Sequence, residues 1–187
     1  MEPKFIKSIN GFELLQFDTI DSTNLWIKAA IKAVELDKPV VVNALEMTGA
    51  KGQGSNKWHF KKAESLGFTM VFPVPKYYNN HLILMNKWIT LQCCKVLTEM
   101  AGKTTLIKWP NDIYCNGKKL CGLLLECIDN SFLLAGIGIN VNNREFPELP
   151  MATSLAVERE EHVAIETLFE ALLQRLTNLD LVQLPVQ

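Results

Sequence analysis

The chain has 187 residues, of which 48% are hydrophobic and 21% charged, with 19 lysines and arginines against 20 aspartates and glutamates. The net charge of −1 excludes a general attraction to nucleic acid or to an anionic membrane, and the apolar runs fall far short of the roughly 20 residues of a membrane span. We therefore expect a soluble globular protein with one domain over residues 1–187, since a single core suits this length.

The elements of the first half are predicted to alternate between helix and strand. Apolar residues recur at the helical period after residues 21–24, as far as Val34. Short β-branched or aromatic runs at residues 40–45 and 66–72 predict two strands. A stronger helical pattern follows at residues 82–100, with a glycine at its end.

Strand-like runs dominate residues 104–142, and a last helix is expected at about residues 163–176. Consecutive strands joined by short turns must be antiparallel, because a parallel crossover needs a dozen or more residues. No Gly-x-Gly-x-x-Gly lies between a strand and a helix, which argues against a Rossmann fold. The predicted fold class is α+β, with a mixed and largely antiparallel sheet packed with helices.

The five cysteines and the N-terminus bear on location. An odd number of cysteines cannot all pair, and the first residues lack the basic and then apolar pattern of a secretory signal. Cys115, Cys121 and Cys127 recur every six residues, but no Cys-x-x-Cys or nearby histidine accompanies them. The sequence predicts a reducing, cytoplasmic location and cysteines that pack in the core.

A hairpin is predicted for residues 119–141, with Asp-Asn at a two-residue turn. One face of it then carries small residues and ends in a cation beside an amide. Its two mid-strand glycines cost of order 0.5–1 kcal/mol each relative to alanine, and they either admit a ligand or relieve packing against a helix. The predicted pairs are Leu123 with Gly136, Cys121 with Gly138, and Lys119 with Asn140.

The run Lys-Trp-Pro-Asn-Asp at residues 108–112 interrupts two strand-like segments. Its proline cannot continue the strand pairing, so Asn111 and Asp112 are expected at a strand edge. Such a run also forms ordinary turns. Lys108 before it and Lys119 after it favour a site for an anionic ligand.

Residues 48–58 form a glycine-rich loop after the first predicted strand. Backbone N–H groups of such a loop can bind a phosphate while Lys51 and Lys57 supply charge. The Gly-Lys-Ser/Thr ending of a Walker loop is missing. A flexible surface loop is the alternative interpretation.

In this order, these segments resemble the catalytic domain of biotin protein ligase, in its form without an N-terminal DNA-binding domain. The resemblance covers about residues 15–155 and implies a fold like that of the class II aminoacyl-tRNA synthetases and biotin synthetases. The motifs are Asp-Ser-Thr-Asn (21–24), the loop ending in Lys57 and Trp58, Lys-Trp-Pro-Asn-Asp (108–112), Lys-Leu-Cys-Gly (119–122), Gly-Ile-Gly-Ile-Asn (136–140) and Ala-Thr-Ser-Leu (152–155).

The resemblance implies a two-step reaction. The biotin carboxylate attacks the α-phosphate of ATP with Mg²⁺ to give biotinyl-5′-adenylate and pyrophosphate, and a lysine of a biotin carboxyl carrier domain then attacks the mixed anhydride. Lys119 and Lys51 would be the catalytic cations, and Asp112 would hold the metal. The implied biotin-binding residues are Ser22, Thr23, Asn24, Lys119, Gly122, Gly136 and Gly138. The implied nucleotide-binding residues are Lys51, Gly52, Gln53, Lys57, Trp58, Lys108, Asn111, Asp112 and Asn140.

The glycine-rich loop departs from the family pattern, which reads Gln, two small residues and then Gly-Arg-Gly-Arg. Here Met47 stands in place of the glutamine and cannot hydrogen-bond biotin as an amide would. Lys51 offers a point charge where arginine gives a bidentate fork. After Trp58, residues 65–67 read Ser-Leu-Gly where the family shows a Gly-Asn-Leu-like stretch. Slow catalysis, altered substrate choice or a lost first step are the expected consequences.

The domains and partners follow from the same resemblance. Neither a helix-turn-helix before residue 15 nor a small C-terminal β domain is evident, so we expect a single catalytic domain without a repressor role. The expected partner is the biotin carboxyl carrier domain of a carboxylase, with no nucleic acid and no membrane. A homodimer is compatible with the family.

Two alternatives stay open. A related lipoate or octanoate ligase or transferase would share the fold and have a longer acyl tunnel, but Lys-Trp-Pro-Asn-Asp argues against it. A catalytically weakened paralogue would bind biotin, a nucleotide or a carrier domain without efficient turnover. Met47, Ala50 and Lys51 support this second alternative.

Overall fold

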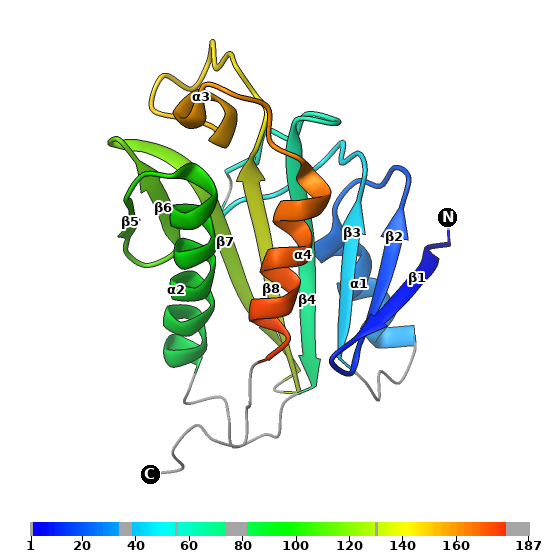
Figure 1. Ribbon diagram of the computed structural model, residues 1–187. Helices are drawn as coiled ribbons and strands as arrows, with labels where there is room; N and C mark the ends of the chain where they lie inside the picture. The colour runs from blue at the N-terminus through cyan, green and yellow to red at the C-terminus, as the bar shows by residue number, and fades with distance from the viewer. Residues whose placement is uncertain (1, 34–38, 55, 74–81, 130, 179–187) are drawn as a thin grey trace.

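An eight-stranded sheet with helices on both faces forms the body of the molecule (Figure 1). The computed structural model describes residues 2–33, 39–54, 56–73, 82–129 and 131–178. The strand order is β1-β2-β3-β4-β8-β7-β6-β5, and every neighbouring pair except β2 with β3 is antiparallel. The predicted α+β class with a mixed, largely antiparallel sheet is therefore confirmed. The strands are β1 (Lys4–Ile9), β2 (Phe12–Phe17), β3 (Val40–Ala44), β4 (Ser65–Pro73), β5 (Thr105–Lys108), β6 (Asp112–Cys115), β7 (Lys118–Ile128) and β8 (Phe132–Asn140).

The three predicted helices are present as α1 (Thr23–Ala33), α2 (Leu82–Ala101) and α4 (Ile165–Leu176). Gly102 follows α2 with a φ of 62°, as expected for a residue that ends a helix. Val34, which the sequence placed on the first helix, lies outside the described residues. None of the described helices is both long and apolar enough to cross a membrane.

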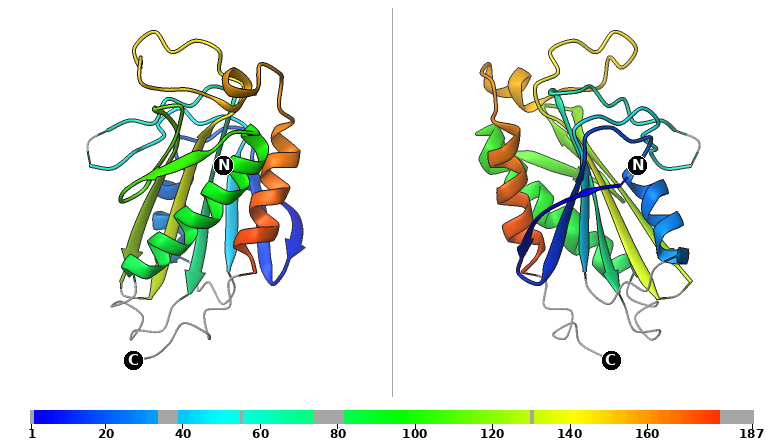
Figure 2. Two further views of the ribbon diagram at one scale, coloured as in Figure 1. Left: turned by 60° about the vertical axis from the view of Figure 1, so that its left-hand side comes forward. Right: turned by 90° about the vertical axis from the view of Figure 1, so that its right-hand side faces the viewer.

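The two faces of the sheet carry different helices (Figure 2). Helices α2 and α4 cover one face and bury the larger apolar cluster, in which the rings of Phe68 and Phe169 lie 5.0 Å apart. Helix α1 covers part of the other face, where Trp26 packs edge-on against Phe17 at 5.0 Å. The α1 face is therefore the less completely covered one, and the functional cavity lies there.

Four cysteines are buried and Cys127 is partly buried, in accordance with the prediction that they pack in the core. Burial raises the pKa of Cys93 to about 12. Burial also raises the pKa of Cys121 well above its ordinary value. These two thiols stay protonated at neutral pH and behave as small apolar side chains.

Strands β1 and β2 and the short helix α3 (Leu155–Arg159) were not predicted. Strand β2 buries Phe12 and Leu14 in the larger apolar cluster and Phe17 in the smaller one, whereas β1 is an edge strand with mostly exposed side chains. Strand β2 pairs in parallel with β3, and α1 is the crossover between them. This connection places the first turn of α1 at the sheet face beside β4 and β8.

The predicted hairpin register is wrong by one residue. The turn has three residues between Ile128 and its partner Phe132, with Asp129 at a φ of 49° and the Ser131 N–H bonded to the Ile128 carbonyl at 3.0 Å. Asn130, half of the expected two-residue turn, lies outside the described residues. A one-residue slip exchanges the faces of a strand. The observed pairs are Leu124 with Gly136, Gly122 with Gly138, and Cys121 with Ile139.

Candidate active site

The floor of the site is a strip of glycines across three neighbouring strands. Gly138 of β8 pairs with Gly67 of β4 on one side and with Gly122 of β7 on the other. Because side chains alternate along a strand, Gly136 lies on the same face two residues from Gly138. The corrected hairpin register brings Gly122 opposite Gly138, and the pairing of β4 with β8 adds Gly67 to the floor.

The space above these glycines is occupied by side chains from other segments. A Cβ added at Gly138 would lie 2.6 Å from Trp58 Cε2, closer than the 3.0 Å that real Cβ atoms respect. At Gly67 an added Cβ would collide with the Met47 methyl group. Close approach of these loop side chains therefore requires glycine at both positions.

A chain of polar contacts holds the N-terminal turn of α1 at one end of the strip. Asn24 accepts a hydrogen bond from Thr69 Oγ1, which lies 2.7 Å from Thr23 Oγ1. Asn24 Nδ2 donates to Glu126 at 3.2 Å, and Glu126 pairs with Lys28 at 2.6 Å. An added Cβ at Gly136 would meet the Asn24 amide, so this end of the strip is lined by fixed polar groups.

Three members of that chain were missed by sequence reasoning: Thr69, Glu126 and Lys28. Lys28 follows Asn24 by four residues and therefore shares its face of the helix. Glu126 lies on the same strand face as Gly122 by simple alternation. These two signals were present in the sequence, whereas Thr69 needed the register of β4 against β8.

Lys119 reaches the glycine face because of a β-bulge. The register between β6 and β7 shifts between Ile113, which pairs with Cys121, and Tyr114, which pairs with Lys119. Leu120 and Cys121 consequently both lie fully buried in the main core. Regular alternation from Cys121 would have put Lys119 on the core face, so the extra residue turns this cation toward the cavity.

The predicted motif at residues 108–112 holds its polar side chains close to β7. The Asp112 carboxylate accepts from Lys119 Nζ at 2.7 Å. Asn111 Nδ2 donates to the Leu123 carbonyl, and the Leu123 N–H donates to the Asn111 carbonyl at 2.9 Å. The peptide bond before Pro110 is cis. Asn111 and Asp112 therefore lie beside the glycine strip, at the start of β6. The prediction of a strand edge is wrong, because Asp112 pairs with Lys108 of β5 on one side and with Gly122 of β7 on the other.

The glycine-rich loop is anchored at its base. Gly49 N–H donates to the Asp21 carbonyl at 2.8 Å, and Thr48 Oγ1 donates to the Asp21 carboxylate at 2.7 Å. The arms of the loop then meet, with Lys51 bridged to Lys57 and the Trp58 N–H bonded to the Ala50 carbonyl at 3.0 Å. The loop thereby places two exposed lysines and one tryptophan against the strip.

A cavity of about 150 Å³ results, with α1, the loop and the strip as its walls. Trp58 lies between Gly138 and Lys119, whose Nζ is 5.8 Å from the ring centroid. Trp58 Nε1 is buried and has no hydrogen-bond partner among the described residues. The structure brings these sequence-predicted residues to the cavity: Ser22, Thr23, Asn24, Lys51, Gly52, Gln53, Lys57, Trp58, Asn111, Asp112, Lys119, Gly122, Gly136 and Gly138.

Two predicted site residues lie elsewhere. Lys108 is exposed, and its Nζ lies 5.1 Å from the ring centroid of Tyr114 rather than in the cavity. Asn140 lines a wider neighbouring groove of about 730 Å³, which shares Trp58 and Lys119 with the first cavity. The far wall of this groove is the segment at residues 145–152, in which the sequence analysis named no binding or catalytic residue.

Fold and site together define a domain that can hold an anionic small molecule. Cations surround a floor of glycines, and a buried indole N–H has no hydrogen-bond partner in the described part of the chain. A sequence model of the Biotin/lipoate A/B protein ligase family matches residues 16–142. The chain belongs to this family.

Individual relatives agree with the family assignment. The bifunctional ligase/repressor BirA of Bacillus subtilis is 31% identical over 160 residues, which are 79% of this chain and 47% of that protein. A biotin–[acetyl-CoA-carboxylase] ligase of Mycobacterium tuberculosis is 29% identical over 138 residues, 72% of this chain and 51% of that protein. The chain therefore spans about half the length of the curated relatives it matches.

The same fold occurs in solved structures of the family. A biotin protein ligase of Aquifex aeolicus in complex with biotin and ATP has a TM-score of 0.75 and 27% identity, over 88% of this chain and 68% of that chain. The biotin protein ligase of Leishmania major in complex with biotinyl-5-AMP has a TM-score of 0.76 at 23% identity. The second likeness shows the shared fold alone.

Proposed function

We propose that this protein is an ATP-dependent biotin protein ligase that forms biotinyl-5′-adenylate and transfers biotin to a lysine of a carrier domain. The observation that carries the proposal is the position of Lys119, which a bulge turns onto a floor of glycines beside Asp112. The Aquifex relative that binds biotin and ATP supports the choice of ligands. We further propose that residues 1–187 act as one catalytic domain.

The first step joins two anions, so it needs positive charge at the reacting atoms. A biotin carboxylate oxygen attacks the α-phosphorus of ATP, the bond to the bridging oxygen breaks, and pyrophosphate leaves with the electron pair. Lys119 would stabilise the charge that grows on the α-phosphate, and the exposed Lys51 and Lys57 would meet the phosphates from the loop. Ser22, Thr23 and Asn24 would hold the ring end of biotin.

The second step needs the adenylate to stay shielded until an amine arrives. The carrier lysine attacks the acyl carbon of the mixed anhydride, an amide forms, and AMP leaves with the electrons of the broken bond. Trp58 fills the space above Gly138 and Gly122 in the structure, so its indole ring would shield from water an acid that is bound beside it in the cavity.

The residues present fit a magnesium ion only in company with phosphate. Within the described part of the chain, no group of three or more His, Cys, Asp or Glu residues could hold a metal. Mg²⁺ is commonly bound by one or two carboxylates together with substrate phosphates. Asp112 would supply the carboxylate, and the ion would neutralise phosphate charge.

The direct test is to incubate the chain with Mg·ATP, a carrier domain and either biotin, lipoate or octanoate, and to weigh the carrier by intact mass spectrometry. The proposal predicts a biotinyl adduct with biotin alone. A lipoyl or octanoyl adduct would assign the chain to the related acyl ligases. An unmodified carrier in every mixture would favour the weakened paralogue that binds without turnover.

The double change Met47→Gln with Lys51→Arg is expected to raise turnover several-fold. Met47 is buried, and its sulfur accepts only a weak hydrogen bond from Thr23 Oγ1 at 3.9 Å. A glutamine amide would give a stronger partner there, and arginine would bind phosphate in bidentate fashion. Pyrophosphate exchange dependent on biotin measures the change, with Lys32→Arg on α1 as the matched control. An unchanged rate would show that the loop does not limit activity.

A further inference from the structure

The backbone of Lys119 is held by a segment outside the main sheet. Pairing of β7 with β8 extends only to Cys121 and Ile139, so Lys119 has no partner on β8. Its N–H donates instead to the Met151 carbonyl at 2.7 Å, and its carbonyl accepts from the Thr153 N–H at 2.9 Å. The position of this cation therefore depends on residues 151–153.

Thr153 also holds a second residue beside the site. Asn140 Nδ2 donates to the Thr153 carbonyl at 3.0 Å, and both residues are buried. One threonine thus connects the cation of the first cavity with the amide of the neighbouring groove. Any displacement of Thr153 would move both groups together.

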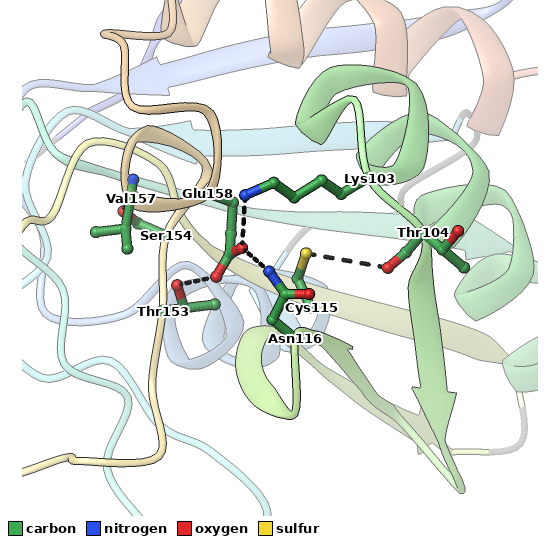
Figure 3. A network of polar contacts seen from close by, with 8 residues as sticks. All are labelled: Lys103, Thr104, Cys115, Asn116, Thr153, Ser154, Val157 and Glu158. Atoms are coloured by element: carbon green, nitrogen blue, oxygen red, sulfur yellow. Dashed lines mark hydrogen bonds and ion pairs between the residues drawn. The ribbon is translucent and has the colours of Figure 1, made fainter.

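The side chain of Thr153 is held in turn by a buried carboxylate (Figure 3). Thr153 Oγ1 donates to Glu158 Oε1 at 2.7 Å. The other oxygen of Glu158 accepts from Asn116 Nδ2 at 2.6 Å and from Lys103 Nζ at 3.5 Å. Only 5% of Glu158 is exposed. These donors come from the segment before α3, from the turn between β6 and β7, and from the segment between α2 and β5.

Glu158 carries a full charge under ordinary conditions. Burial by itself raises the pKa of Glu158, but the hydrogen bonds from Thr153 and Asn116 and the charge of Lys103 outweigh it and leave the pKa below its usual value. Hydrogen bonds to an ionised acceptor are roughly twice as strong as neutral ones. A glutamine at this position would turn one acceptor into a donor and leave a buried donor of the network unpaired.

We infer that Glu158 is a positioning residue for Lys119, acting through Thr153 from outside the cavity. The inference deepens the proposed function and rests on it for its catalytic consequence. Glu158 lines neither the cavity nor the neighbouring groove. Its role is to keep residues 151–153 in the one position in which they complete the backbone hydrogen bonds of Lys119.

The first test is independent of activity. Amide hydrogen exchange is measured on the full chain for wild type, Glu158→Gln and the matched control Glu161→Gln, which makes the same change at an exposed site three residues away. The N–H groups of Lys119 and Thr153 should exchange at least about tenfold faster in Glu158→Gln. The Lys119 N–H donates to the Met151 carbonyl and the Thr153 N–H donates to the Lys119 carbonyl, so both hydrogen bonds are lost when residues 151–153 move away from Lys119. Strand β4 should be unaffected, and Glu161→Gln should match wild type.

The second test examines whether the hydroxyl of Thr153 is required. It keeps the inference testable if Glu158→Gln does not fold. Thr153→Val removes the hydroxyl at constant shape, whereas Thr153→Ser keeps it. Thr153→Val should lower the kcat of biotin-dependent pyrophosphate exchange about 10- to 100-fold, with a smaller change in the KM for biotin, because a misplaced cation affects the transition state most. Thr153→Ser should stay within a few-fold of wild type.

The outcomes distinguish failure of the positioning role of Glu158 from failure of the proposed ligase function. Unchanged exchange at Lys119 and Thr153 in both Glu158→Gln and Thr153→Val would overturn the positioning role. Equal kcat values for Thr153→Val and Thr153→Ser would overturn it too. If wild type shows no pyrophosphate exchange, the proposed function fails, while hydrogen exchange still decides whether Glu158 holds the segment.

Discussion

Replacement of Lys119 by alanine should abolish adenylate formation and leave the fold intact. Removing one preorganised group that stabilises transition-state charge typically costs about 10²–10³ in rate. The side chain is 34% exposed, and an ion pair of that kind contributes little to folding, about 0–1 kcal/mol. Biotin-dependent pyrophosphate exchange should therefore fall by at least about 10²-fold while the thermal midpoint moves little.

The neighbouring Lys118 provides the control, since it carries the same charge, is exposed and does not line the cavity. Lys118→Ala should retain the wild-type exchange rate. Near-normal exchange in Lys119→Ala would exclude Lys119 as the catalytic cation. Equal losses in both variants would mean that net charge near the cavity, and not the position of Lys119, matters.

The second large effect is expected from Gly138→Val. The floor at Gly138 has no room for a side chain, since even one methyl group would lie 2.6 Å from the Trp58 ring. The valine must displace Trp58 or occupy the space above the strip, at an overpacking cost of about 1–3 kcal/mol. Isothermal titration should show biotin binding weakened at least about 100-fold.

Ile139→Val is the matched control for this change. Ile139 is the next residue of β8, but its side chain is fully buried in the main core on the opposite face. Removing one methylene there should cost about 0.5–1.5 kcal/mol of stability and leave the dissociation constant for biotin unchanged. If Gly138→Val binds biotin with wild-type affinity, the strip is not the floor of the binding site.

For the glycine-rich loop, the residue types predicted which residues belong to the site but not where each side chain lies. Lys51, Lys57 and Trp58 were expected at the site because glycines and lysines after a strand are typical of an anion site, and they do line the cavity. The sequence did not indicate that the Trp58 ring would lie against the strip. That placement depends on the paired arms of the loop and on its attachment to Asp21, which is distant in the sequence.

The far wall of the neighbouring groove could not be predicted from residue types. This wall is irregular backbone, and irregular backbone has no periodicity from which its course can be predicted. Residues 151–153 reach Lys119 through two backbone hydrogen bonds, and Thr153 is bonded in turn to Asn140 and Glu158. The hydrophobic pattern of the helices, by contrast, determined α1, α2 and α4 within one or two residues at most boundaries, since burial of one face requires the helical period.

The sequence by itself determined the α+β class, the three long helices and the residue types of the site, because periodicity and motif order are local properties. Only the tertiary structure decided which face each site residue occupies. The hairpin register depends on one additional turn residue at residues 129–131, and the orientation of Lys119 depends on a bulge near Leu120. Strict alternation has a period of two, so one extra residue at either place reverses the face of every residue beyond it, and the composition of the chain does not record where that residue falls.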